Sequence, residues 1–202
     1  MKKLLFPFLA ALAFGCNNTP KATPGYTISG RFDGFDMDSV WLFANQDDRK
    51  PVAGSAVKNG FFQFEGTTAE PSLGFIATRG DKLCDLVVEN GDIKIEMTGK
   101  TLNDISITGS PANDAVTRDF ARLTEQFKEV SCDNPEKQQE LIMQLWKDGA
   151  TTNRDNYCGV MYIMNLAEQI PNDQLQALYN GLSSSMKATK GAASIREFLN
   201  NQ

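Results

Sequence analysis

The sequence contains no histidine, and this absence excludes several kinds of catalytic chemistry. Without imidazole there is no histidine general base, proton shuttle or metal ligand, so Ser-His-Asp triads, Cys-His pairs and zinc-hydrolase sites are ruled out. Glycine-rich phosphate loops, nucleophile elbows and paired acid/base motifs are missing as well. We therefore predict that the protein is not an enzyme and that it carries no cofactor and no metal.

Basic residues are also in short supply. The chain has 20 Lys and Arg residues against 25 Asp and Glu residues, which gives a net charge of -5. Nucleic-acid binding needs clustered Lys and Arg to neutralise phosphates, and the sequence has no such cluster, so we expect no nucleic-acid partner. The acidic groups do not have the EF-hand spacing, and we interpret them as solvated turn carboxylates rather than as a calcium site: Asp33, Asp36, Asp38, Asp47 and Asp48.

Cysteine is scarce too. Besides Cys16 the chain has Cys84, Cys132 and Cys158, and no two of these form a Cys-x-x-Cys motif. A thioredoxin-type reaction needs a thiolate with a resolving thiol one turn away, so we expect no oxidoreductase activity from this chain alone. Two interpretations stay open: either Cys132 and Cys158 form a structural disulfide while Cys84 is a buried free thiol, or all three are buried and unpaired.

The one long apolar run lies at the N-terminus. It follows two lysines, extends from Leu4 to Phe14, and is separated from Cys16 by a single glycine. A run this short, interrupted by Pro7, is typical of a cleavable signal and too brief for a permanent membrane span. We therefore predict a signal peptide over residues 1–15.

The Gly15-Cys16 junction resembles a lipobox. This resemblance implies cleavage directly before Cys16 and a diacylglycerol on its thiol, which anchors the mature protein to a membrane. Residues 16–25 contain two prolines and no bulky apolar side chain, so we predict that they form a lipidated tether. The alternative interpretations are a secretory signal that is cut elsewhere, or an N-terminal strand that is buried in the fold.

Residues 26–109 carry the pattern of short antiparallel strands. Asn59-Gly60 and Asn90-Gly91 each lie between alternating apolar residues, and an Asn-Gly pair suits the type I′ turn. We therefore predict hairpins over Ala53–Gly66 and Leu86–Met97. Regularly spaced antiparallel strands favour a small β sandwich or a partly open barrel.

The aromatic residues of these strands recur at a spacing of two, which is typical of side chains that face a core. We therefore expect most of them to be buried, namely Trp41, Phe43, Phe62, Phe64 and Phe75. Phe61 is the exception, because it points to the opposite face from Phe62, and we expect it to be exposed for a partner.

After Ser110 the apolar spacing changes to that of helices. Ser110 followed by Pro111 is typical of a helix start. The apolar residues that follow are expected to share one buried face of the first helix: Val116, Phe120, Leu123, Phe127 and Val130. This change of period predicts a helical region over residues 110–202.

Later start and stop signals divide that region further. They predict helices from Asn134-Pro135 to Gly149, from Asn156 to Ile170 and from Asn172 onward, with a last turn or two at Ile195–Leu199. Because strands come first and helices second, with no βαβ alternation, the fold class is predicted as α+β. The expected architecture is an N-terminal antiparallel β domain followed by a C-terminal helical region.

Four segments resemble a known family by their order and spacing: Tyr26–Gly30, Val57–Gly66, Val88–Ile93 and Thr108–Ser110. The family comprises Bacteroidetes-type lipoproteins with the domain of unknown function 4369. That domain usually precedes a thioredoxin-like domain in proteins of the thiol:disulfide interchange or peroxiredoxin-like kind. The present sequence stops at Gln202, where such a module would begin, so the resemblance implies no redox activity for this chain.

Together these features predict a lipid-anchored protein that faces the periplasm, on either the inner or the outer membrane. The residues after Cys16 lack the acidic character of surface-export signals in such bacteria. The leading hypothesis is a non-catalytic binding module of the cell envelope that docks an envelope protein or a small ligand. The alternative is an accessory component of envelope thiol redox or stress handling, which acts with a separate thioredoxin-like protein.

Overall fold

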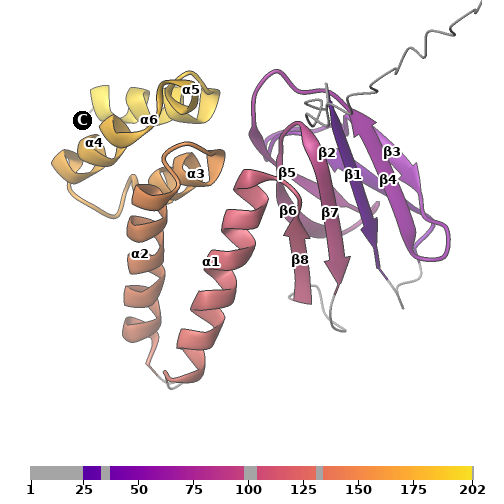
Figure 1. The fold of residues 1–202 in the computed structure, drawn as a ribbon, viewed down its shortest axis with the longest axis horizontal. Helices are drawn as coiled ribbons and strands as arrows, with labels where there is room; N and C mark the ends of the chain where they lie inside the picture. The colour runs from indigo at the N-terminus through magenta and orange to yellow at the C-terminus, as the bar shows by residue number, and fades with distance from the viewer. Residues whose placement is uncertain (1–24, 33–36, 98–103, 131–133, 202) are drawn as a thin grey trace, which may run out of the picture.

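The structure, a computed structural model, describes residues 25–32, 37–97, 104–130 and 134–201. A β sandwich comes first in the chain and a group of helices follows (Figure 1). The α+β fold class is therefore confirmed. Within the described residues, no helix combines the length and the apolar composition that a bilayer span requires.

Each layer of the sandwich is a sheet of four strands. The first sheet has the order β4 (Phe61–Gly66), β1 (Tyr26–Arg31), β7 (Gly91–Met97) and β8 (Ile105–Thr108). The second has the order β3 (Ala53–Ala56), β2 (Ser39–Phe43), β5 (Ser72–Ala77) and β6 (Lys82–Val88). Alternate side chains from both sheets fill the space between them, among them Ile28, Val40, Leu42, Ile76, Ile93 and Ile95.

The Asn59-Gly60 turn forms as predicted, but it does not join two paired strands. Both residues have positive φ, at 53° and 76°, and Lys58 bridges to Phe61 across the turn. The strands on either side, β3 and β4, nevertheless belong to different sheets. The hairpin prediction was therefore wrong beyond the turn itself, because β4 pairs with β1 and β3 pairs with β2.

The second predicted hairpin does not form, because β6 and β7 lie in opposite sheets. The Asn90 side chain accepts a hydrogen bond from the Thr68 N–H and donates one to the Thr68 carbonyl. These bonds fix the connection between β6 and β7, which crosses from the second sheet to the first. Gly91 donates its N–H to the carbonyl of Gly25. β7 consequently starts beside β1 and pairs with it in parallel, whereas the other described strand pairs are antiparallel.

Three aromatic residues that we expected in the core lie instead on the outer face of the second sheet. Trp41, Phe43 and Phe75 are half-buried, and the rings of Phe43 and Phe75 stack with centroids 4.4 Å apart. The guanidinium of Arg79 lies 5.9 Å from the centroid of the Trp41 ring. The prediction that Phe61 is exposed is confirmed, with 48% of its surface accessible.

The described helices are α1 (Pro111–Lys128), α2 (Pro135–Thr152), α3 (Tyr157–Leu166), α4 (Asn172–Gly181), α5 (Ser184–Lys187) and α6 (Lys190–Asn200). Two predicted ends were wrong: α2 continues past Gly149, and α3 stops before Ile170. The weak signal at Ile195–Leu199 belongs to a helix of 11 residues. Asn134 and Asn156 accept N-capping hydrogen bonds. Ser110 holds the N-cap position of α1 but its side chain makes no capping hydrogen bond, and Pro171 rather than Asn172 is the N-cap of α4.

Figure 1 shows α1 and α2 as a long antiparallel pair, with α1 beside β8 and the shorter helices packed at one end of the pair. The helical core contains Cys158, Val160, Ile163, Leu166 and Leu175, all of them fully buried. Val87 of β6 is part of the same apolar cluster. The sandwich and the helices therefore share packed side chains along the edge where α1 meets the sheets.

Candidate functional site

The two sheets of the sandwich each end in an edge strand on the side that faces α1. These strands are β6 in the second sheet and β8 in the first. An edge strand presents unpaired backbone N–H and C=O groups, which proteins usually cover or block. Here α1 lies against both edges, and side chains from successive turns of the helix reach the two strands.

Asn113 pairs with the edge of β6. Its Oδ1 accepts a hydrogen bond from the Val87 N–H at 2.9 Å, and its Nδ2 donates to the Val87 carbonyl at 2.8 Å. The same Nδ2 also donates to the hydroxyl of Ser110 at 2.8 Å. Asn113 is only 2% exposed, so these bonds satisfy its buried amide and both backbone groups of Val87.

Thr117 does the same for the edge of β8. Its hydroxyl accepts from the Ile107 N–H at 3.2 Å and donates to the Ile107 carbonyl at 2.6 Å. Because Asn113 and Thr117 are four residues apart, they lie on one face of α1, about 6 Å apart along its axis. The first turns of α1 thus close the open side of the sandwich at this level.

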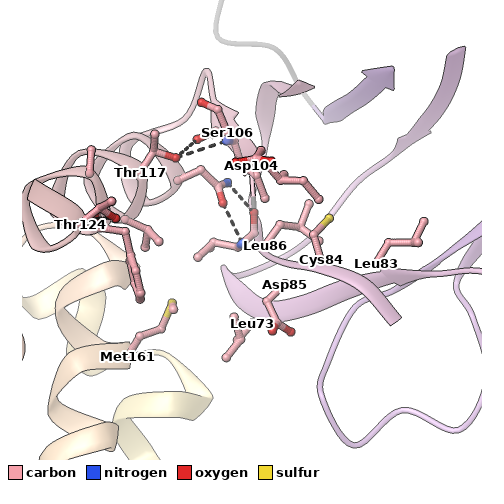
Figure 2. A pocket seen from close by; sticks show the side chains of 17 residues that line it. Leu73, Leu83, Cys84, Asp85, Leu86, Asp104, Ser106, Thr117, Thr124 and Met161 are labelled. Carbon is pink, nitrogen blue, oxygen red and sulfur yellow. Dashed lines mark hydrogen bonds between the residues drawn. The ribbon is translucent and has the colours of Figure 1, made fainter. Parts of the chain in front are cut away.

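Beyond this closure, the two edges and α1 leave a groove with a volume of about 600 Å³ (Figure 2). We call this cavity the edge groove. Its apolar lining includes Leu73 from β5, Ile105 from β8, Val116 and Phe120 from α1, and Met161 from α3. Its polar lining includes Asp85, Ser106 and Thr124. A cavity of this size, mostly apolar with a few polar groups, is typical of a ligand site.

Phe120 is the most unusual residue of the edge groove. We predicted that it faces the helical core, yet 49% of its surface is exposed. The residue that turns inward in its place is Asp119, which is 6% exposed. A large exposed aromatic side chain beside an apolar cavity is a feature that binding sites share.

Comparison with known families bears on this part of the chain. Residues 26–116 match the family model described as Domain of unknown function (DUF4369). These residues form a DUF4369 domain. No curated protein and no solved structure matches the chain.

The DUF4369 match runs past the sandwich into α1, and it includes Asn113. The side chain that closes the β6 edge is therefore part of the family domain. Thr117 follows directly after the match, and Phe120 lies three residues further along α1. The edge groove is consequently built from the DUF4369 domain and the continuation of the helix with which that domain ends.

Cys84 is the one cysteine of the described residues that lines the edge groove. Its thiol is free, and burial, with a smaller contribution from the charge of Asp85, raises its pKa to about 12. Such a thiol is protonated at neutral pH and is a poor nucleophile. The carboxylate of Asp85 is paired with Lys82 and accepts a hydrogen bond from Gln46 at 2.6 Å.

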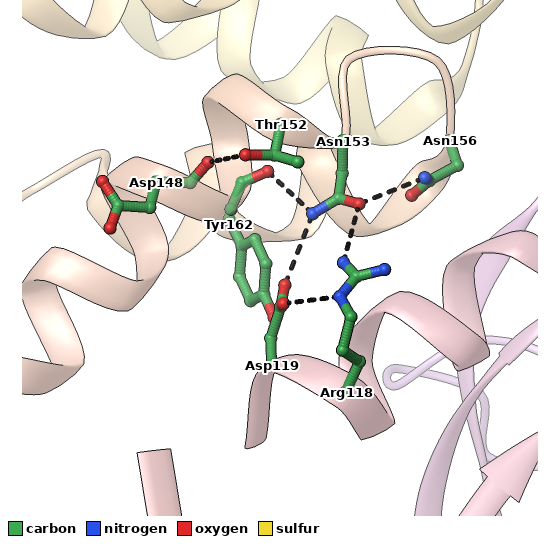
Figure 3. A network of polar contacts seen from close by, with 8 residues as sticks. Arg118, Asp119, Asp148, Thr152, Asn153, Asn156 and Tyr162 are labelled. Atoms are coloured by element: carbon green, nitrogen blue, oxygen red, sulfur yellow. Dashed lines mark hydrogen bonds and ion pairs between the residues drawn. The ribbon is translucent and has the colours of Figure 1, made fainter. Parts of the chain in front are cut away.

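A buried polar network holds α1 against α2 and α3 (Figure 3). The Asp119 carboxylate accepts hydrogen bonds from the Tyr162 hydroxyl at 3.3 Å and from Nδ2 of Asn153 at 3.4 Å, and pairs with Nε of Arg118 at 3.1 Å. Asn153 also accepts from Arg118 and from Asn156, both at 3.4 Å. Because donors surround the carboxylate, the network fixes the position of α1 rather than offering a reactive group.

The cysteines that we singled out from the sequence do not meet in the edge groove. Cys158 is fully buried in the helical core, and burial raises the pKa of its thiol to about 12. Cys16 and Cys132 lie outside the described residues, so the lipid on Cys16 and the Cys132–Cys158 disulfide stay predictions. Within the described ranges, no group of three or more acidic or cysteine side chains is arranged to hold a metal ion.

The groove residues were missed because their roles depend on contacts between distant parts of the chain. Asn113 reaches a strand 26 residues earlier, and Thr117 reaches one 10 residues earlier. The available signal was a pair of polar residues four apart, within two turns of a helix that follows the last strand. That spacing places both side chains on the face that meets the sheets.

Proposed function

We propose that this protein is a membrane-anchored periplasmic lipoprotein that works as a non-catalytic binding module of the cell envelope. Its DUF4369 domain and α1 together bind an envelope protein or a small ligand in the edge groove. The observation that carries the proposal is the half-exposed ring of Phe120 beside an apolar cavity of about 600 Å³. The membrane attachment rests on the lipobox-like Gly15-Cys16 junction.

The chemistry of the groove supports binding without catalysis. Its thiol, on Cys84, has a pKa of about 12, and the carboxylate of Asp85 is engaged by Lys82 and Gln46. An accessory role in envelope thiol redox was the alternative expectation. No contact among the described residues favours it over binding alone, and capture of a partner with a Cys-x-x-Cys motif would support it.

The binding part of the proposal is tested with two matched variants. Phe120→Asp places a charge at the edge groove, and Phe61→Asp places the same charge on the similarly exposed phenylalanine of β4, the competing partner site that the sequence suggested. Each full chain is immobilised and exposed to a detergent-solubilised envelope fraction. We expect the wild type and Phe61→Asp to retain the same proteins or small molecules, and Phe120→Asp to lose them. Identical retention by all three chains would count against the groove.

The anchoring part is tested separately by mass spectrometry of the mature N-terminus. We expect the mature chain to begin at an acylated Cys16, and a Cys16→Ser variant to lack the acyl mass and to leave the membrane fraction. An unmodified N-terminus downstream of Cys16 would refute the anchor. The result would leave the groove experiment unaffected, because the two tests share no residue.

A further inference from the structure

The pairing of Asn113 with Val87 shows what the edge of β6 is built to accept. A neighbouring strand offers one carbonyl and one N–H to each outward-facing residue of an edge. The side-chain amide of Asn113 offers the same two groups, with Oδ1 on the Val87 N–H and Nδ2 on the Val87 carbonyl. At this position the amide therefore takes the place of a peptide group of an added strand.

The next outward-facing position of β6 is Asp85. In the β5–β6 ladder, Leu73 is opposite Val87 and Phe75 is opposite Asp85. Outward-facing backbone groups recur at every second residue, so the N–H and C=O of Asp85 point to the same side as those of Val87. Because these two groups point away from β5, the pairing of β6 with β5 does not use them. They face the edge groove, which Asp85 also lines.

The β8 edge borders the same groove from the other sheet. The backbone N–H and C=O of Ile107 point away from β7 and pair with Thr117. The backbone groups of Ile105, two residues earlier, therefore point to the same side. Both Asp85 and Ile105 line the groove. A chain that lies between them meets backbone donors and acceptors of β6 on one side and the edge of β8 on the other.

We propose that the occupant of the edge groove is an extended polypeptide segment of a partner protein, which adds to β6 at Asp85. The segment continues the row of backbone pairs that Asn113 begins at Val87, and one of its side chains packs on Phe120. This inference rests on the proposed function and names the class of ligand. Main-chain pairing supplies affinity in such strand addition, and the pockets beside it supply specificity.

Two other occupants fit the groove less well. A small apolar molecule leaves the backbone N–H and C=O of Asp85 without partners in a partly desolvated site, which costs free energy. A second copy of this chain would have to bring its own β6 edge into a groove that α1 borders in both copies. A single extended segment avoids both difficulties.

The test uses a phage-displayed library of random seven-residue peptides, selected on the immobilised full chain. We expect binders with alternating apolar and β-branched residues that bind wild type and Phe61→Asp alike and Phe120→Asp at least about tenfold more weakly. N-methylation of the amides on one edge of the best peptide should weaken binding by a similar factor. By NMR, the Asp85 amide should exchange with solvent at least about tenfold more slowly in the complex.

The outcomes separate this inference from the proposed function. If no library peptide binds in a Phe120-dependent way, or if the Asp85 amide exchanges at an unchanged rate, strand addition is wrong. The proposed function then still stands, provided that the envelope fraction shows Phe120-dependent capture. A groove-dependent dimer in sedimentation, abolished by Phe120→Asp and unaffected by Phe61→Asp, would also overturn the inference in favour of a second copy.

Discussion

The hydroxyl of Tyr162 on α3 donates a hydrogen bond to the carboxylate of Asp119 on α1, and both side chains are buried. This bond joins two helices that are separated in the sequence by the whole of α2. It also sets which face of α1 turns inward. With Asp119 directed into the helical region, its neighbour Phe120 is left on the side of the edge groove.

Removal of the Asp119 carboxylate should destabilise the protein. In Asp119→Ala, the Tyr162 hydroxyl loses its acceptor, and Nδ2 of Asn153 keeps only one of its two acceptors, the Gly149 carbonyl. We therefore expect a loss of about 2–3 kcal/mol in the free energy of unfolding. Asp148→Ala is the control, because Asp148 is an exposed aspartate of α2. Urea unfolding of the full chains measures both, and equal stability of the two variants would contradict a role for the network.

The contact between Asn113 and Val87 should be equally costly to remove. Asn113→Ala leaves the backbone N–H and C=O of Val87 without partners at a buried edge, and we expect a loss of about 2–3 kcal/mol. Asn165→Ala makes the same change at an exposed position of α3 and should alter stability by less than about 0.5 kcal/mol. A loss below 1 kcal/mol for Asn113→Ala would show that water replaces the amide.

Gly149 lies inside α2 because the ring of Tyr162 packs on it. A Cβ at this position would overlap the Cδ2 and Cε2 atoms of that ring. We therefore expect Gly149→Ala to destabilise by about 1–2 kcal/mol, even after the gain in helix propensity. At Gly181 of α4, the nearest atom to an added Cβ is 3.6 Å away, so Gly181→Ala should be neutral or slightly stabilising. Thermal unfolding that ranks the two variants in the opposite order would be inconsistent with this packing.

The buried thiols predict how stability depends on pH. Burial raises the pKa of Cys84 and of Cys158 to about 12, while an exposed thiol has a pKa of about 8.5. Above pH 8.5 or so the unfolded chain therefore releases protons that the folded chain keeps. This contribution to stability is complete below that pH and is lost as pH rises toward 12, at roughly 1 kcal/mol per pH unit and thiol.

The measurement is urea unfolding between about pH 7.5 and 10 in reducing buffer. A Cys84→Ala, Cys158→Ala double variant should lose less stability over this range than the wild type does. The upper limit avoids the tyrosines, since burial also raises the pKa of Tyr162 above its usual value. Parallel pH profiles for the two proteins would contradict the assignment to the thiols.

The sequence predicted the fold class because apolar spacing depends on local geometry. A spacing of two before Thr108 and a helical spacing after Ser110 are properties of single elements. Strand pairing is not local in this sense. The Asn59-Gly60 turn fixes the reversal of the chain, but nothing in the turn decides whether β3 and β4 join one sheet or face each other across the core.

The groove was beyond sequence reasoning for a related reason. Phe120 has the spacing of a core residue, and its exposure follows from the absence of any described element that covers that side of α1. Asp119 looks like a surface residue until Tyr162 and Asn153 are placed around it. Gly149 likewise has the pattern of a helix stop, and only the packed ring of Tyr162 shows why a glycine lies inside the helix.

Photo-crosslinking in living cells shows whether the edge groove binds a partner in the envelope. A benzophenone amino acid is introduced at Phe120 in one full chain and at Phe61 in another, two sites of almost equal exposure. We expect a discrete crosslinked product from position 120 and none from position 61. Equal crosslinking from both positions, or none from position 120 in membrane-anchored protein, would contradict this expectation.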